Sequence, residues 1–395
     1  MIDSAPWWER LALPALGGLC AGAIGLAVTR RRGVSGVGFV MEAIVLGRAR
    51  VPLVRSAAQA LAAWLAIAGA SSLGREGPLI QFGAAAGEGA RRAFRLDDAT
   101  ARLALASGVA AGFAAAYNAP IAAVLFVVEI VTGVLVLEAV VPMLVASVIA
   151  TVITRYVVGA APIYGLRAFD APHPIELFAF AGLGLVAAPV GVGFLRLLSF
   201  ADRMWRHLPL PVRPAAGGLV CGAVLCGVPL VAGNGFEPLD ALLDGRLAIA
   251  ATAWLLLAKP LATAASVGSG NPGGAFTPTL LIGGLVGSLY AAGMHGVFGD
   301  GAASTGSYAL VGLAAALAAT THAPITAVVL ACEISGDFAL VLPLLSACAV
   351  ASAFARRLYV DSIYTAELTR RGVRWRLTLD GRRVVERQGD APDVG

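Results

Sequence analysis

The sequence has few charged residues for its length. Asp, Glu, Lys and Arg make up 13% of its 395 residues, whereas soluble domains contain about 25%. Hydrophobic residues make up 58% and form long apolar runs, among them Leu11–Val28 and Phe178–Leu197. Some runs reach the roughly 20 residues that cross a bilayer, and shorter ones are typical of broken helices. The composition therefore excludes a soluble domain and predicts an all-α polytopic membrane protein.

Cysteine is also scarce and is not arranged for chemistry. The chain has five cysteines. All lie in apolar segments without the spacing of metal ligands, so we interpret them as small hydrophobic residues. No cofactor or metal is expected. No nucleic-acid partner is expected either, because the net charge of +5 comes from arginines that cluster beside apolar runs.

The charges that are present predict the topology. Asp3 and Glu9 precede the first apolar run and Arg30–Arg32 follow it, which predicts that this span runs from outside to inside. The tail arginines place the C-terminus in the cytoplasm, and we expect the plasma (inner) membrane of a bacterium. The start MIDSAPWWER has no features of a signal peptide. An outside start without an export signal predicts that a further helix precedes the sequence.

A duplication is the most informative feature of the chain. GVAAGFAAAYNAPIAAVLFVVEI at 108–130 is matched by GLAAALAATTHAPITAVVLACEI at 312–334, with Gly, Ala-Pro-Ile and Glu-Ile each 204 residues later. A second set of four residues recurs 200 residues later: Gly74, Pro78, Gly83 and Gly87. Duplicated apolar segments interrupted by Gly and Pro are typical of transporters or channels with two repeats around a midplane site.

The duplication divides the chain. We expect one transmembrane domain at 1–368, with a first repeat at about 10–158, a second at about 175–358, and a short polar tail at 369–395. The segment Gly159–Pro174 is predicted to be the loop between the halves. The sequence offsets alone leave open whether the repeats are inverted.

Two Gly- and Pro-rich segments at equivalent places indicate an anion site. Gly74-Arg75-Glu76-Gly77-Pro78 predicts a helix that starts with Pro in its first turn. Helix N-termini carry unpaired N–H groups and a partial positive charge, which suit an anion. An ionised Glu76 would occupy such a site, and a protonated one could leave it. The alternative is a water-exposed Glu76 paired with Arg75.

The second segment, Gly268–Pro278, contains no acid. It offers backbone amides before a helix that starts near Pro278, and such irregular backbone must line a cavity or be buried in protein. Two helix starts that face one point would bind an anion without a fixed cation. A Lys or Arg in the site would instead hold chloride too tightly for release.

Together with Ser35 and Tyr364, these segments resemble the CLC family of chloride channels and proton-coupled chloride exchangers. GREGP at Gly74–Pro78, GGAFTP at Gly273–Pro278 and the segment from His322 to Pro343 carry the resemblance over about residues 10–368. It implies a homodimer with one pore per subunit, two inverted repeats of tilted and broken helices, and chloride as the transported ion.

The resemblance also implies roles for individual residues. Glu76 matches the gating glutamate that takes up an external proton. The central anion would be held by the Ser35 hydroxyl, the amides of Ala275 and Phe276, and the Tyr364 hydroxyl. The helix starts that line the pore would include Gly74, Arg75, Gly77, Pro78, Gly274, Thr277 and Pro278.

Departures from the family pattern bear on mechanism. Gly38 stands where the family has Pro after the serine. Ile130 stands where exchangers carry a second, internal glutamate, and Ile cannot relay a proton. No paired nucleotide-binding domain follows the membrane part. We therefore expect a voltage- or pH-sensitive channel or an uncoupled carrier, with a proton-coupled chloride antiporter as the alternative. Neither is an enzyme.

Other interpretations stay open at this point. Gly33-Val34-Ser35-Gly36 also matches the short motif of rhomboid intramembrane proteases, with His322 as the base of a dyad. A fragment that does not transport is a third alternative. For Glu129 and Glu333, which share one repeat position, we expect structural roles. Lys259 is interpreted as a buried charge with an unidentified partner.

Overall fold

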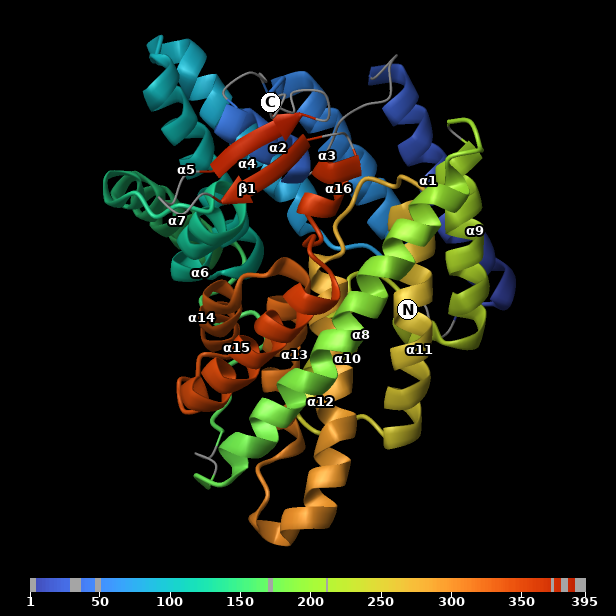
Figure 1. Cartoon of the computed structure of the whole chain (residues 1–395). Coiled ribbons are helices and arrows are strands. Elements are labelled where there is room, and N and C mark those ends of the chain that lie inside the picture. Colours follow the sequence, from blue (N-terminus) through green and yellow to red (C-terminus); the bar gives the residue numbers. More distant parts are fainter. Residues whose placement is uncertain are drawn as a thin grey trace, which may run out of the picture.

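The computed structural model describes residues 5–28, 37–46, 51–169, 173–210, 212–370, 373–377 and 383–387. Within these residues the first half consists of helices joined by short connections (Figure 1). Its elements are α1 (Trp7–Val28), α2 (Val37–Leu46), α3 (Leu53–Ala68), α4 (Glu76–Phe94), α5 (Asp98–Tyr117), α6 (Pro120–Phe126), a π-helical continuation η2 (Val127–Thr132) and α7 (Leu137–Val157).

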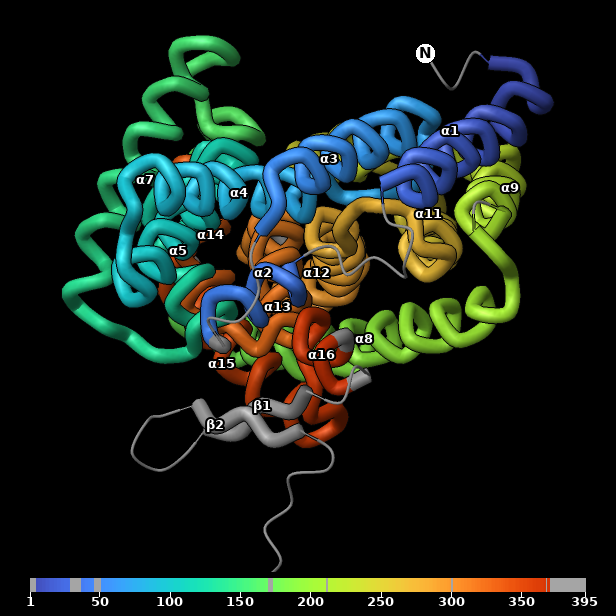
Figure 2. Tube along the Cα trace, turned by 90° about the horizontal axis from the view of Figure 1, so that it is seen from above, coloured from blue at the N-terminus to red at the C-terminus, as the bar shows by residue number. Residues whose placement is uncertain are grey.

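The second half follows after a linker at 158–175. Its elements are α8 (Glu176–Trp205), α9 (Val212–Gly227), η3 (Pro229–Val231), α10 (Phe236–Leu243), α11 (Ile249–Gly268), α12 (Phe276–Phe298), η4 (Gly299–Gly301), α13 (Thr305–Thr321), α14 (Pro324–Ser335) and α15 (Val341–Leu358). Seen from above, α12 and α13 lie near the centre, with α1, α3, α9 and α11 to one side (Figure 2).

The expected polytopic membrane protein is confirmed. Among the described residues, seven helices are long and apolar enough to cross a membrane: α1, α5, α7, α8, α11, α12 and α15. The shorter apolar helices α6 and α14 begin at breaks in the chain, Asn118-Ala-Pro120 and His322-Ala-Pro324, where α5 and α13 end. Asn118 and His322 have positive φ angles of 54° and 59°, which ends the preceding helix, and Pro starts the next one because its missing N–H costs nothing there.

A local two-fold axis relates the halves. Gly74 N–H donates to Gly274 O (2.7 Å), and Gly274 N–H donates to Gly74 O (2.9 Å). Each glycine thus pairs antiparallel with its own repeat equivalent, as a two-fold axis requires.

The same symmetry joins α6 and α14. Glu129, just beyond α6, accepts hydrogen bonds from the backbone N–H groups of Ile325 (3.3 Å) and Thr326 (2.8 Å) at the start of α14. Glu333, near the end of α14, accepts them from Ile121 (3.0 Å) and Ala122 (2.7 Å) at the start of α6. Each segment ends where the other begins, so the two run antiparallel and the repeats are inverted. Both glutamates cap helix N-termini, a structural role.

Glycines allow the close packing of neighbouring helices. A Cβ atom at Gly83 would lie 2.0 Å from Gly108 O, and one at Gly283 would lie 2.4 Å from Gly312 O. These contacts join α4 to α5 and α12 to α13, the equivalent helix pairs of the two halves. A side chain at these positions would force the backbones apart.

The C-terminal segment adds short elements to the helical core. Tyr364 precedes α16 (Thr365–Arg370), which is followed by strands β1 (Val373–Leu377) and β2 (Arg383–Arg387). The strands pair antiparallel, from Val373 opposite Arg387 to Leu377 opposite Arg383. Both strands lie in the segment 369–395, for which the sequence predicts a short polar tail.

Candidate functional site

The Gly74–Gly274 bridge brings the starts of α4 and α12 together. Helix α4 begins at Glu76 and α12 at Phe276, each two residues after the bridge. Pro78 and Pro278 lie in the first turn of their helices, both buried. Two helix N-termini therefore meet inside the protein, as the two Gly- and Pro-rich segments predict.

The Glu76 carboxylate lies at this meeting point. Its side chain is 1% exposed. Oε1 accepts a hydrogen bond from Phe276 N–H (2.9 Å), and Oε2 accepts one from the Thr277 hydroxyl (2.8 Å). The carboxylate of the first half thus occupies the N-terminus of α12 in the second half, where an anion is favoured. A water-exposed Glu76 is excluded.

Glycine is required on both sides of this carboxylate. A Cβ atom at Gly274 would lie 1.9 Å from Glu76 Oε1, and one at Gly74 would lie 2.3 Å from both carboxylate oxygens. Any side chain at either position would collide with the carboxylate. Gly77 faces the bridge, but a Cβ atom there would lie 3.7 Å from Gly274 N, an ordinary contact distance.

Arg75, which precedes Glu76 in the sequence, does not bond to the carboxylate in the described contacts. Its Nη2 donates to Ala116 O (2.9 Å), at the end of α5. The Glu76 carboxylate is held instead by the Phe276 amide, the Thr277 hydroxyl and the N-terminus of α12. Such neutral donors stabilise an anion without the strong binding that a fixed cation would give.

Tyr117 is a site residue that the sequence did not reveal. Its hydroxyl forms a hydrogen bond with Thr277 Oγ1 (2.8 Å) and reaches Glu76 Oε2 at 3.5 Å. The signal in the sequence was an aromatic residue with a polar group at the break between α5 and α6, because a buried Tyr hydroxyl usually has a partner. In the second repeat this position is Thr321.

Aromatic rings surround the site. Phe276 packs edge-on against Phe113 (centroids 5.6 Å apart) and against Phe126 (6.1 Å), and Phe126 packs edge-on against Tyr364 (5.9 Å). These contacts join α5, α6, α12 and the segment before α16 in one wall. Neither Phe113 nor Phe126 was singled out from the sequence, since a lone aromatic residue in an apolar run usually belongs to the core.

Tyr364 lies at the opposite end of this wall from Glu76. Its side chain is 8% exposed, and its hydroxyl has no hydrogen-bond partner among the described residues. Ile363 N–H donates to Thr320 O (2.8 Å), which fixes the segment against the end of α13. A buried hydroxyl without a partner is a donor available to a ligand.

The remaining predicted residues are placed as follows. Ala275 precedes α12 and is 7% exposed. Ile130 is buried in η2 at 4% exposure. Ser35 lies outside the described residues, and so do Gly33, Val34 and Gly36 of the protease-like motif. Within the described part of the chain, no group of His, Cys, Asp and Glu could hold a metal ion.

The fold and the site define a class of protein: a multi-pass membrane protein with two inverted repeats, whose helix N-termini meet at a buried acid. A sequence profile described as "Voltage gated chloride channel" matches residues 17–356. The chain belongs to this family, the CLC family.

Relatives and solved structures agree with this assignment. A "Putative chloride channel protein ClcB-like" of Ralstonia nicotianae is 39% identical over 92% of this chain and 86% of its own. The "Voltage-gated ClC-type chloride channel ClcB" of Escherichia coli is 35% identical over 90% and 86%.

Among solved structures, a slow cyanobacterial Cl⁻/H⁺ antiporter superposes with a TM-score of 0.84 at 26% identity, over 92% of this chain and 87% of that one. A eukaryotic CLC transporter superposes with a TM-score of 0.77 at 21% identity, over 93% and 66%. The second likeness concerns the fold alone.

Proposed function

We propose that this protein moves chloride across the membrane along a path that the Glu76 carboxylate blocks. The observation that carries the proposal is the position of that carboxylate on Phe276 N–H and the Thr277 hydroxyl. A bound carboxylate oxygen and a small anion need the same donors. Glu76 in this place is therefore a competitor of the transported ion.

Protonation of Glu76 would release the block. A neutral carboxyl group loses its attraction to the helix N-terminus and to the hydroxyl donor, and can leave the site. Chloride would then take its place on the same groups. The neutral donors would allow the ion to leave again, since no fixed cation holds it.

A second anion position would lie deeper, toward Tyr364. We assign its donors as the amides of Ala275 and Phe276 and the hydroxyl of Tyr364, with the Ser35 hydroxyl as the donor from outside the described residues. The buried, unpartnered hydroxyl of Tyr364 supports this assignment. A Phe at this position would remove the donor and keep the ring contact with Phe126.

The finer activity is a voltage- or pH-sensitive channel or an uncoupled carrier. Ile130 is buried and apolar, so it cannot pass a proton from the cytoplasmic side. The channel names of the two ClcB relatives agree with this proposal. A proton-coupled antiporter is the alternative, favoured by the Cl⁻/H⁺ antiporter structure.

We further propose that the protein is a homodimer of a bacterial plasma (inner) membrane, with its C-terminus in the cytoplasm. The arginines that follow α15 support this orientation by the positive-inside rule. Cross-linking in native membranes tests the dimer, and protease access to the C-terminus in inverted and right-side-out vesicles tests the orientation.

The test of function is transport by purified protein in liposomes under a chloride gradient, with chloride and proton movement recorded together. Chloride efflux without proton movement supports a channel or uncoupled carrier. Uphill proton movement with chloride establishes the antiporter. Glu76→Gln should keep chloride efflux and remove its dependence on pH, whereas the exposed control Glu237→Gln should change neither. Absence of chloride efflux from every variant contradicts the proposal.

A further inference from the structure

Two backbone hydrogen bonds on either side of Tyr364 differ in what they connect. Thr365 N–H donates to Ser362 Oγ (3.2 Å), a bond that stays within the segment at the start of α16. Ile363 N–H donates to Thr320 O (2.8 Å), in the last turn of α13. Of these two bonds, only the one from Ile363 joins the segment to a helix of the membrane core.

The end of α13 is held in turn by α15. Arg356, in the last turn of α15, donates through Nη2 to His322 O (2.6 Å). His322 directly follows α13, so its carbonyl group belongs to a helix C-terminus, where the partial negative charge favours a cation. A hydrogen bond from a guanidinium group is also stronger than one between neutral groups. Arg356 therefore fixes the last turn of α13, two residues from Thr320.

The bond from Arg356 does not involve the His322 imidazole. Arg356 contacts the main-chain carbonyl group, whereas His322 Nε2 is buried without a hydrogen-bond partner among the described residues. The repeat equivalent of His322 is Asn118, which also ends its helix with a positive φ angle. An Asn at position 322 would keep the carbonyl group and the helix ending, and would remove only the imidazole.

The break in the first repeat is also held by an arginine, but with a different result. Arg155 Nε of α7 donates to Asn118 Oδ1 (2.9 Å), and Asn118 Nδ2 donates to Ala161 O (2.9 Å). There the arginine orders a side chain that fastens the linker between the halves. In the second repeat the arginine holds main chain, and the same turn of main chain binds Ile363.

The direction of the Tyr364 hydroxyl depends on this main chain. The Tyr364 ring packs edge-on against Phe126, with centroids 5.9 Å apart, and such a contact is worth only about 0.5–1.5 kcal/mol. The hydroxyl itself is held by no other group in the described part of the chain. The backbone bond of Ile363 to α13 therefore sets where the hydroxyl points.

We propose that Arg356 is a positioning residue for Tyr364. Through the end of α13 and the bond to Ile363, it keeps the Tyr364 hydroxyl at the inner end of the anion path. The role of this hydroxyl as an anion donor rests on the proposed function, but the contacts that lead from Arg356 to Tyr364 do not. Arg357 offers a matched control, because it is the neighbouring residue, is exposed and carries the same charge.

The first test reads the position of Tyr364 without transport. Protein labelled with fluorotyrosine is studied by fluorine NMR in detergent, and the Tyr364 signal is the one that Tyr364→Phe lacks. Arg356→Ala should shift or split this signal. Arg356→Lys, which keeps a cationic donor, His322→Asn and Arg357→Ala should leave it as in the parent, and gel filtration checks that each variant keeps its fold. An unchanged signal in Arg356→Ala, or an equal change in Arg357→Ala, overturns the proposal.

The second test measures the chloride concentration that gives half-maximal efflux from liposomes. Arg356→Ala should raise it about fivefold, which corresponds to about 1 kcal/mol, and Arg357→Ala should keep it within a factor of about two. In a Tyr364→Phe background no hydroxyl remains to be positioned, so Arg356→Ala should have no further effect. The same effect in both backgrounds would show that Arg356 acts by its charge alone, against the proposal.

The two tests separate this inference from the proposed function. A Tyr364 signal that moves with Arg356→Ala but does not respond to added chloride supports the positioning residue and contradicts Tyr364 as an anion donor. A signal that responds to chloride and is unchanged by Arg356→Ala supports the donor and contradicts the positioning residue.

Discussion

The two helix starts at the centre of the molecule occupy equivalent positions but have different chemistry. Glu76 and Gly77 of α4 correspond to Phe276 and Thr277 of α12, each 200 residues later. The start of α4 supplies an acid and no side-chain donor. The second half supplies the amide and hydroxyl that bind that acid. The site is therefore formed by the difference between the repeats.

Where the repeats agree, the shared residues build the scaffold. Gly74 and Gly274 pair with each other, and Glu129 and Glu333 cap each other's partner helix. Symmetry-related residues make the same contact twice, so they stabilise the two-fold arrangement. Glu76 breaks the symmetry at a central position, and this supports the proposal that it competes with the transported ion.

The largest effect is expected from Gly274→Ala, which tests whether the two starts can meet only through glycine. The new Cβ would lie 1.9 Å from Glu76 Oε1 and would expel the carboxylate from both donors. Because chloride is proposed to take the place of this oxygen, the Cβ would also exclude chloride. Overpacking of this kind costs about 1–3 kcal/mol, so the initial rate of chloride efflux should fall by a factor of about ten to a hundred. Gly293→Ala of α12, which has open space around it, should leave the rate unchanged.

The next effect concerns the reciprocal caps, where the halves are alike. Glu129→Ala and Glu333→Ala each leave two N–H groups of a helix start without a partner, so each should cost about 1–3 kcal/mol of stability. We expect similar losses of stability for the two variants. The measurement is gel filtration after heating, which gives the temperature at which half of the protein no longer elutes as a single species. Glu42→Ala in α2, outside these caps, is the control. A loss confined to one of the two glutamates would contradict the symmetry.

The fold could be predicted from the sequence because its signals are long or repeated. Apolar runs predict spanning helices, and the Ala-Pro-Ile segments 204 residues apart predict two broken helices at equivalent places. Inversion could not be predicted from the offsets. It became visible only in the contacts of Glu129 with the start of α14 and of Glu333 with the start of α6.

The site could be predicted in part. Glu76 and the helix starts were found because Gly, Pro and an acid in an apolar chain are unusual. Tyr117 was missed because its contact to Thr277 spans 160 residues, and no local pattern reports such a distance. The bond from Arg356 to His322 O was missed for the same reason, since it joins α15 to the end of α13.

A smaller effect is expected from Thr277→Val, which makes the second helix start resemble the first in lacking a side-chain donor. The carboxylate would lose the Thr277 hydroxyl and keep Phe276 N–H, and Tyr117 would lose its hydrogen-bond partner. One hydrogen bond to a charged group is worth about 1.5 kcal/mol, or roughly tenfold in the rate at which Glu76 leaves. Thr279→Val, whose hydroxyl bonds to Ala275 O in the same helix, is the matched control. Equal efflux from the two variants would show that the hydroxyl does not hold the gate.

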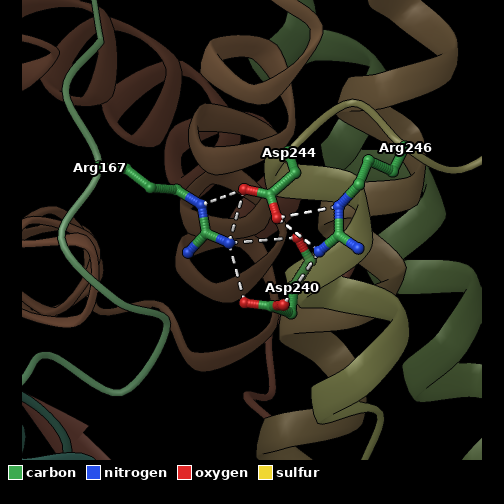
Figure 3. Close-up of polar contacts among 4 residues, drawn as sticks. All are labelled: Arg167, Asp240, Asp244 and Arg246. Carbon is green, nitrogen blue, oxygen red and sulfur yellow. Dashed lines mark hydrogen bonds and ion pairs between the residues drawn. The ribbon is translucent and has the colours of Figure 1, made fainter.

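The smallest effect is expected from the ion-pair cluster of Arg167, Asp240, Asp244 and Arg246 (Figure 3), and it separates this cluster from Glu76 as a sensor of pH. The hydrogen bond from Arg246 lowers the pKa of Asp244 below its ordinary value of 3.8, and Arg167 adds to this. A carboxyl group with a lowered pKa stabilises the fold above its unfolded pKa and loses this contribution only as pH falls through the folded pKa. The Asp244 contacts should therefore stay unchanged between pH 7 and 5. Efflux recorded over this range should rise with acidity through Glu76 alone: Glu76→Gln removes the dependence, whereas Asp244→Asn keeps the same ratio of rates at the two pH values. A ratio that changes with Asp244→Asn and survives Glu76→Gln would place the sensor in this cluster and leave the difference between the two helix starts without a role in gating.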